Sequence, residues 1–140
     1  MRAVILAVER PGGSPLTAAG GVACKALLPI GDRPMLQRVL DTLREAETVD
    51  ELIVCGPATL SDHPWMNDTP LVAAAETPAL SVLSTLGTLP DNEPVLVTTA
   101  DHALLRAEIV DYFVSAASAA PADVTAGVAR LEVVRDTYPE

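Results

Sequence analysis

The chain has 140 residues, a net charge of −10 at neutral pH and a pI near 4.4. Hydrophobic residues make up 49% of it and aromatic residues only 3%. This composition excludes whole-chain disorder and predicts a core of Val, Leu, Ile and Ala, the usual filling of a buried parallel sheet. The length suits one domain. The acidic balance, without a basic stripe, argues against binding to nucleic acid.

The cysteines and the N-terminus indicate a cytoplasmic protein. Cys24 and Cys55 form no CxxC motif, which argues against structural zinc and favours reduced thiols. The apolar run that ends at Val8 is too short for a signal sequence or a membrane span. No other stretch has the length needed to cross a bilayer, so we expect no membrane partner.

The first half of the chain predicts two strands around a helix. Residues 3–8 are continuously apolar and β-branched, which predicts a buried strand, and residues 9–24 follow as a long glycine-bearing loop. Apolar residues recur at helical spacing over 35–43. Residues 51–55 predict a second strand, and 58–70 an irregular segment.

The second half continues the alternation. A weaker strand is expected at 71–75, and Thr77-Pro78 predicts the start of a helix. Residues 95–100 are a clear strand, followed by an amphipathic helix, and 122–128 predict a last strand. Apolar residues line one side of each helix: Leu80, Leu83 and Leu86 face one way in the first, and Ile109, Val110, Phe113, Val114 and Ala117 form a stripe along the second.

The element order predicts a three-layer, Rossmann-like α/β domain over residues 1–140. Alternating strands and helices form a mostly parallel sheet with right-handed crossovers and helices on its faces. The chain stops at 136–140 without a predicted terminal strand or helix. A strand edge left unpaired there would favour a homodimer, because exposed edges invite pairing.

Candidate functional residues gather at one edge of this predicted sheet. Ligands of open α/β sheets bind beyond the carboxyl ends of the strands. Gly12 and Gly13, after the first strand, can present backbone N–H groups to phosphate, and Lys25 can neutralise its charge. Asp101 directly follows the 95–100 strand, where a carboxylate can hold a hard cation.

Simpler interpretations of the same residues stay open. The glycine-bearing loop can be a surface loop with a solvated lysine, and Asp101 can cap the helix that follows it. His102 is better explained as a loop side chain than as a ligand, and Cys24 as a spare thiol. The sequence contains no dinucleotide-binding G-x-G-x-x-G after the first strand, no P-loop and no G-x-S-x-G nucleophile elbow.

Two segments resemble a known family in the order that the family has them. Residues 3–7, a Gly-bearing loop and then Lys-Ala-Leu-Leu-Pro-Ile-Gly-Asp-Arg-Pro-Met-Leu at 25–36 resemble the opening of MobA-like NTP transferases. The family pattern is a strand ending in Leu-Ala-Gly-Gly, a loop, and Lys-x-Leu-Leu-Pro-x-x-Gly-x-Pro-Met-Leu. Residues 95–102 resemble its second signature, where a strand delivers the metal-binding aspartate. The resemblance spans about residues 3–128.

The resemblance implies a GT-A-like fold that binds a nucleoside triphosphate with Mg²⁺. A phosphate oxygen of a small phosphorylated acceptor attacks the α-phosphorus, and pyrophosphate leaves. By position, the catalytic residues would be Lys25, on the triphosphate, and Asp101, on the metal. The implied nucleotide-binding residues are Ala7, Val8, Gly12, Gly13, Lys25 and Ser81, the last in a segment that resembles the part approaching the base.

Two departures from the family pattern leave three functional hypotheses. Val8 and Glu9 stand where the family has Gly-Gly, and the family is commonly longer, so the chain would lack the usual C-terminal part. The first hypothesis is an active Mg²⁺-dependent nucleotidyltransferase that obtains its acceptor region from a partner. The second is a catalytically weak nucleotide-binding or assembly module, and the third a glycosyltransferase-like binder of nucleotide sugars.

Overall fold

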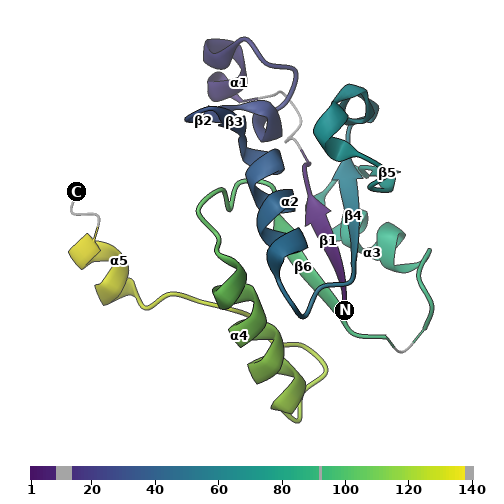
Figure 1. Cartoon of the computed structure of the whole chain (residues 1–140), viewed down its shortest axis with the longest axis vertical. Helices are drawn as coiled ribbons and strands as arrows, with labels where there is room; N and C mark the ends of the chain where they lie inside the picture. The colour runs from purple at the N-terminus through teal and green to yellow at the C-terminus, as the bar shows by residue number, and fades with distance from the viewer. Residues whose placement is uncertain (9–13, 92, 138–140) are drawn as a thin grey trace.

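The computed structural model describes residues 1–8, 14–91 and 93–137 (Figure 1). Its main sheet has four parallel strands in the order β5-β4-β1-β6. These strands are β1 (Arg2–Leu6), β4 (Glu51–Gly56), β5 (Leu71–Ala73) and β6 (Val95–Thr99). In the central strand, Leu6 pairs with Cys55 on one side and with Thr99 on the other, so the carboxyl ends of three strands lie at one edge of the sheet.

Helices and short turns connect these strands. The α-helices are α1 (Pro15–Gly20), α2 (Met35–Glu45), α3 (Pro78–Leu86), α4 (Ala107–Ala119) and α5 (Leu131–Thr137). The 3₁₀ turns are η1 (Lys25–Leu27), η2 (Ala58–Asp62) and η3 (Pro64–Met66), and β2 (Pro29–Ile30) pairs with β3 (Arg33–Pro34) in a small antiparallel ribbon. No helix in the described part of the chain has the length and apolar character needed to span a bilayer.

The helices form a layer on each face of the sheet, which confirms the predicted three-layer α/β class. On one face, α2 and α4 contact each other over a core that includes Ile5, Leu40 and Val110. On the other face, α3 packs against β1 and β4. Helix α5 has no buried residue, and Figure 1 shows it (yellow) apart from the sheet.

The side of α3 that carries Leu80 and Leu83 is not the side that packs against the sheet. Leu80 and Leu83 are 47% and 63% exposed, whereas Ser81 and Thr85 are fully buried. Both buried hydroxyls donate hydrogen bonds to the carbonyl four residues earlier, at 2.9 and 2.8 Å, so neither is left unsatisfied. Small, internally satisfied side chains let the helix approach the sheet closely. In α4 the predicted stripe is confirmed at Val110 and Val114, but Ile109 is 45% exposed.

The last predicted strand, at 122–128, was also wrong, because these residues form an exposed segment without regular structure. The handedness of the crossovers explains this. Helix α2 covers one face on the way from β1 to β4, and α3 covers the other face on the way from β5 back to β6. Because α4 lies on the α2 face, a parallel strand beyond β6 would complete a left-handed crossover, which proteins almost never form.

Two further segments are more ordered than the sequence predicted. Within the expected loop 9–24, Ser14 accepts a hydrogen bond from the Leu16 N–H and Pro15 occupies the first turn, so α1 forms there. The helix ends at Gly21, whose φ of 62° suits glycine. The C-terminal region, expected to lack regular structure, contains α5.

Candidate functional site

Lys25 and Asp101 meet at the carboxyl edge of the sheet, as the sequence predicted. The Lys25 Nζ lies 2.7 Å from the Asp101 Oδ2, although 76 residues separate them in sequence. Lys25 opens η1, between the buried Cys24 and Ala26, which anchor the turn in the core. Asp101 follows β6, and the Ala100 N–H donates to the Leu6 carbonyl at 2.9 Å, fixing the end of the strand against β1.

Asp101 is held as an anion by two donors. The ammonium of Lys25 is the larger cause of the lowered pKa of Asp101, and the Thr99 hydroxyl, which donates to Oδ1 at 2.5 Å, is the second. Partial burial opposes them but does not reverse the shift. The carboxylate is therefore ionised at neutral pH while its side chain remains 45% exposed, so it is accessible to a ligand.

A cavity of about 560 Å³ opens beside this ion pair, a size typical of small-molecule sites. It lies between the ends of β1 and β6, the start of α1 and the start of α3. Its lining residues are Leu6, Ala7, Val8, Ser14, Pro15, Leu16, Lys25, Ala26, Met35, Pro78, Thr99, Ala100 and Asp101. The wall is mainly apolar and carries one cation and one anion side by side.

The other predicted binding residues differ in their placement. Ala7 and Val8 line the cavity, but the Ala7 N–H already donates to the Cys55 carbonyl at 2.8 Å. Gly12 and Gly13 lie outside the described residues. Ser81 is buried in α3, where its Oγ accepts from the Ala75 N–H at 2.9 Å, and it does not line this cavity. Its role toward a base stays a prediction.

The alternative role of Asp101 as a helix cap is wrong. Helix α4 begins at Ala107, with Arg106 at the N-cap position. Asp101 instead accepts hydrogen bonds from Lys25 and Thr99. Its neighbour His102 has Nδ1 3.0 Å from the Thr98 hydroxyl, which agrees with a structural role for that ring.

Asp101 can hold a hard cation only if a bound ligand or water supplies further oxygen atoms to coordinate it. Among the described residues, no cluster of three His, Cys, Asp or Glu side chains could hold a metal by itself. Mg²⁺ does not require such a cluster, because it commonly binds through one or two carboxylates together with water and substrate phosphates. Asp101, in the lining of a cavity large enough for a small phosphorylated molecule, fits that second arrangement.

Several residues of the site were not predicted. Thr99 orients Asp101, while Ser14, Met35 and Pro78 contribute to the cavity wall. A hydroxyl two residues before a strand-end aspartate is a local signal that sequence alone could have supplied. The other three come from separate elements, and only the packing of those elements brings them together. Lys25 is also the only lysine of the chain, so an amine-reactive reagent modifies no other side-chain ammonium group.

Comparisons with known proteins identify the family of the chain. The family profile described as MobA-like NTP transferase domain matches residues 3–134. The chain is 33% identical over 125 residues to the 2-C-methyl-D-erythritol 4-phosphate cytidylyltransferase of Frankia casuarinae, covering 86% of this chain and 46% of that protein. It therefore spans about half the length of this relative.

Solved structures show the same fold. A hypothetical transferase from Thermus thermophilus superposes with a TM-score of 0.65 at 23% identity, covering 83% of this chain and 46% of that one. Rv0371c of Mycobacterium tuberculosis H37Rv, in complex with manganese, gives a TM-score of 0.61 at 22% identity, covering 84% and 59%. With the profile covering nearly all of its residues, the chain belongs to the MobA-like NTP transferase family.

Proposed function

We propose that the chain binds a nucleoside triphosphate with Mg²⁺ and transfers its nucleotidyl group to a small phosphorylated acceptor, releasing pyrophosphate. The observation that carries the proposal is the contact of 2.7 Å between Lys25 and Asp101 at the mouth of the cavity between β1 and β6. Family membership supports nucleotidyl transfer. The name of the Frankia casuarinae relative includes a phosphorylated polyol, which supports the acceptor class.

In the proposed reaction the two charged side chains exchange partners when substrate binds. The Lys25 ammonium moves from Asp101 to the triphosphate, and the Asp101 carboxylate turns to the cation that accompanies it. An exposed ion pair contributes at most about 1 kcal/mol, so separating the two groups costs little. Until substrate arrives, each group keeps the other in position at the edge of the sheet.

The chemical step forms one P–O bond and breaks another. A phosphate oxygen of the acceptor attacks the α-phosphorus, while the bond from that phosphorus to the bridging oxygen breaks and pyrophosphate leaves with the electron pair. Lys25 offsets negative charge on the phosphates, and Asp101 with the substrate phosphates would hold Mg²⁺. The metal, when bound, adds charge neutralisation and in-line orientation. The manganese complex of Rv0371c supports a divalent cation.

Calorimetry and a pyrophosphate assay test this proposal together. We expect one or more of the common NTPs to bind with Mg²⁺ and to bind much more weakly without it. We expect pyrophosphate release only when an acceptor from a panel of sugar and polyol phosphates is also present. Failure of every NTP to bind, at any Mg²⁺ concentration, would contradict the proposed function. The assignment of the fold would not be affected.

Val8 favours a second candidate, a nucleotide-binding module with little turnover. It lines the cavity where the family has glycine, so its side chain narrows the approach of phosphate to the backbone. For such a module, Val8→Gly should tighten NTP binding by about tenfold, equivalent to ~1.4 kcal/mol. The change should also lower the stability by roughly 0.5–1 kcal/mol, because glycine has more backbone freedom to lose.

A matched variant separates the effect of Val8→Gly on NTP affinity from its effect on folding stability. Val49→Gly changes a valine that packs against the core, away from the cavity lining, and should lower stability without changing NTP affinity. Calorimetry for affinity and thermal unfolding for stability measure the two effects separately. If Val8→Gly leaves the affinity unchanged, Val8 is not the obstacle and the weak-module candidate loses its support.

A further inference from the structure

A second cavity, of about 590 Å³, adjoins the first at Asp101. Asp101 and Met35 line both of them. From Asp101 the first cavity extends toward α1 and α3, and the second toward β2 and the first turn of α4. The proposed transfer joins two substrates at Asp101, and each of the two cavities that meet there can hold one of them.

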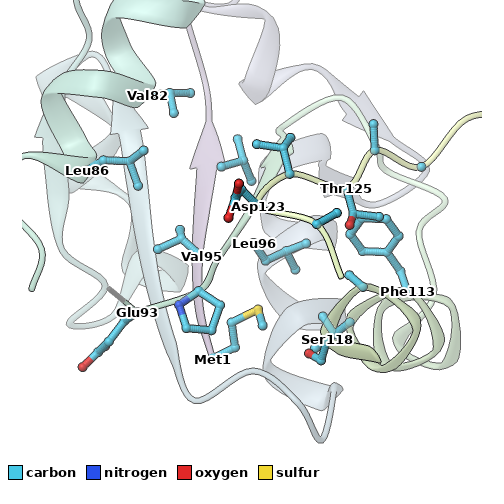
Figure 2. Close-up of a pocket in the computed structure, with 18 residues that line it drawn as sticks. Met1, Val82, Leu86, Glu93, Val95, Leu96, Phe113, Ser118, Asp123 and Thr125 are labelled. Atoms are coloured by element: carbon cyan, nitrogen blue, oxygen red, sulfur yellow. The ribbon is translucent and has the colours of Figure 1, made fainter. Parts of the chain in front are cut away.

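A third hollow, a groove of about 690 Å³, lies away from the ion pair (Figure 2). Met1 and Glu93 line it, and they precede β1 and β6. Asp101 follows the opposite, carboxyl end of β6, and it does not line this groove. Of these three hollows, the first and the second are the two that reach Asp101.

The lining of the second cavity is apolar apart from Asp101 and His102. Its apolar members are Ile30, Met35, Ala103, Leu104, Leu105 and Ile109. A hydroxyl that lies against such a wall loses its hydrogen bonds to water and gains no partner, whereas a methylene group gains apolar contact. The wall therefore favours a ligand with an apolar body over one that carries a hydroxyl on each carbon.

His102 supplies a polar group at the Asp101 end of this wall. Its Nδ1 lies 3.0 Å from the hydroxyl of Thr98, which is 8% exposed, and that bond fixes the ring. Within the described part of the chain the ring makes this one hydrogen bond, so Nε2 is the nitrogen available to a ligand. An imidazole N–H can donate to a phosphate oxygen.

The loop that carries these residues is closed by its own hydrogen bonds. The His102 N–H donates to the Thr99 carbonyl at 3.3 Å, and the Leu105 N–H donates to the His102 carbonyl at 2.9 Å. The Thr42 hydroxyl donates to the Leu105 carbonyl at 3.1 Å, which ties the loop to α2. Because the wall is held in place before a ligand binds, binding loses little conformational freedom.

We propose that the second cavity binds the acceptor, and that this acceptor is a phosphate ester with an apolar body. Its phosphate lies beside Asp101 and the His102 ring, and its body lies against Leu104 and Ile109. The NTP occupies the first cavity, so the two substrates meet at Asp101. The role as acceptor site rests on the proposed function, whereas the preference for an apolar ester is a property of the cavity that can be measured without nucleotide.

Proton NMR of the two histidines tests where a phosphate ester binds. His63 stacks on Trp65, with ring centroids 5.0 Å apart, and does not line the second cavity. Hexyl phosphate, titrated in the presence of Mg²⁺ at fixed pH, should shift the imidazole C–H resonances of His102 and leave those of His63 in place. His63→Asn assigns the two sets of resonances. A failure of hexyl phosphate to bind, or binding that leaves the His102 resonances unshifted, would overturn the proposal.

Calorimetry with a matched pair of ligands tests the preference. Hexyl phosphate and D-glucitol 6-phosphate have the same number of carbons and the same phosphate, but the second carries a hydroxyl on each remaining carbon. Hexyl phosphate should bind at least about tenfold more tightly. Leu104→Gln, at a residue that is 78% exposed, should reduce this ratio by about threefold or more. Leu83→Gln, at an exposed leucine of α3 outside the cavity, should leave the ratio unchanged.

A double variant tests the role of His102. Thr98→Val with His102→Phe removes both members of the hydrogen bond, so no buried hydroxyl is left unpaired. It should weaken the binding of both ligands by about tenfold and keep their ratio, and circular dichroism checks that it is folded. Unchanged affinities in the folded double variant would overturn the part assigned to His102.

The outcomes separate this proposal from the proposed function. If hexyl phosphate binds beside His102 but no NTP binds, the transfer reaction fails and the preference of the cavity stands. If an NTP binds with Mg²⁺ and D-glucitol 6-phosphate binds as tightly as hexyl phosphate, the apolar preference is overturned and the transfer reaction is unaffected. In a chain that binds NTP, hexyl phosphate should also support faster pyrophosphate release than D-glucitol 6-phosphate, and the reverse order would overturn its assignment as the acceptor type.

Discussion

Replacing Asp101 by asparagine is expected to abolish Mg²⁺-dependent NTP binding and to slow pyrophosphate release by roughly 10³-fold, a loss of about 4 kcal/mol. Asparagine keeps the size of the side chain and an oxygen for Thr99, but it removes the negative charge. The effect is large because Asp101 is the one carboxylate among the described residues that line the cavity. Calorimetry with and without Mg²⁺ measures the first effect, and a coupled pyrophosphate assay the second.

The pKa of Asp101 determines the pH range in which its carboxylate can bind a metal ion. The Lys25 ammonium, and then the Thr99 hydroxyl, lower the pKa of Asp101 below its ordinary value of 3.8. Any stability that its ionised form contributes is therefore present above the ordinary pKa and is lost as the pH falls through the lowered pKa. Asp101 should thus impose no loss of metal binding between about pH 5 and neutrality.

An aspartate outside the cavity provides the control. Asp91 lies in the exposed turn before β6, and Asp91→Asn makes the same chemical change away from the site. It should leave NTP affinity and its Mg²⁺ dependence intact. If Asp101→Asn behaves like Asp91→Asn, the cation is held by other groups and Asp101 serves only to position Lys25.

The architecture and the central contact of the site were predictable from the sequence for one reason. Runs of apolar and β-branched residues marked β1 and β6. The carboxyl ends of parallel strands necessarily share an edge of the sheet. That rule alone brings Asp101 to the edge at which β1 ends. The further step, that Lys25 reaches Asp101, follows from η1 returning to the core through Cys24 and Ala26.

The sequence prediction failed for α3 and for residues 122–128. Both failures have physical causes that cannot be recognised from the pattern of apolar residues. In α3 the periodicity favoured Leu80 and Leu83, yet hydroxyls that bond to their own helix allowed Ser81 and Thr85 to face the sheet. At 122–128 the composition was that of a strand, but strand formation requires a neighbour. Because α4 lies beside α2, a connection through α4 to a parallel strand next to β6 would be a left-handed crossover. The handedness of that crossover depends on the whole fold, so the local sequence does not reveal it.

Substitution of Lys25 is expected to cause a second large loss in the rate of pyrophosphate release. Lys25→Met should lower the rate of pyrophosphate release by about 10²–10³-fold, because it removes a fixed positive charge from phosphates on which negative charge develops. Lys25→Arg should recover part of the rate, since it keeps the charge but places it on a larger planar group. Folding stability should change by no more than about 1 kcal/mol in either variant, because the ion pair with Asp101 is exposed.

Because Lys25 is the only lysine, its contact with phosphate can be tested without substitution. An amine-reactive ester should modify Lys25 and the N-terminal amine, and Mg²⁺ with a binding NTP should protect Lys25 selectively. Peptide mass spectrometry measures both sites, and the N-terminus serves as the internal reference, since it lies beside Thr48 and Asp50 at the amino end of β1. Arg130→Met, in the exposed segment after α4, is the matched variant for lost charge and should keep full activity. Equal modification of Lys25 with and without nucleotide, in a chain shown to bind it, would place the triphosphate away from this lysine.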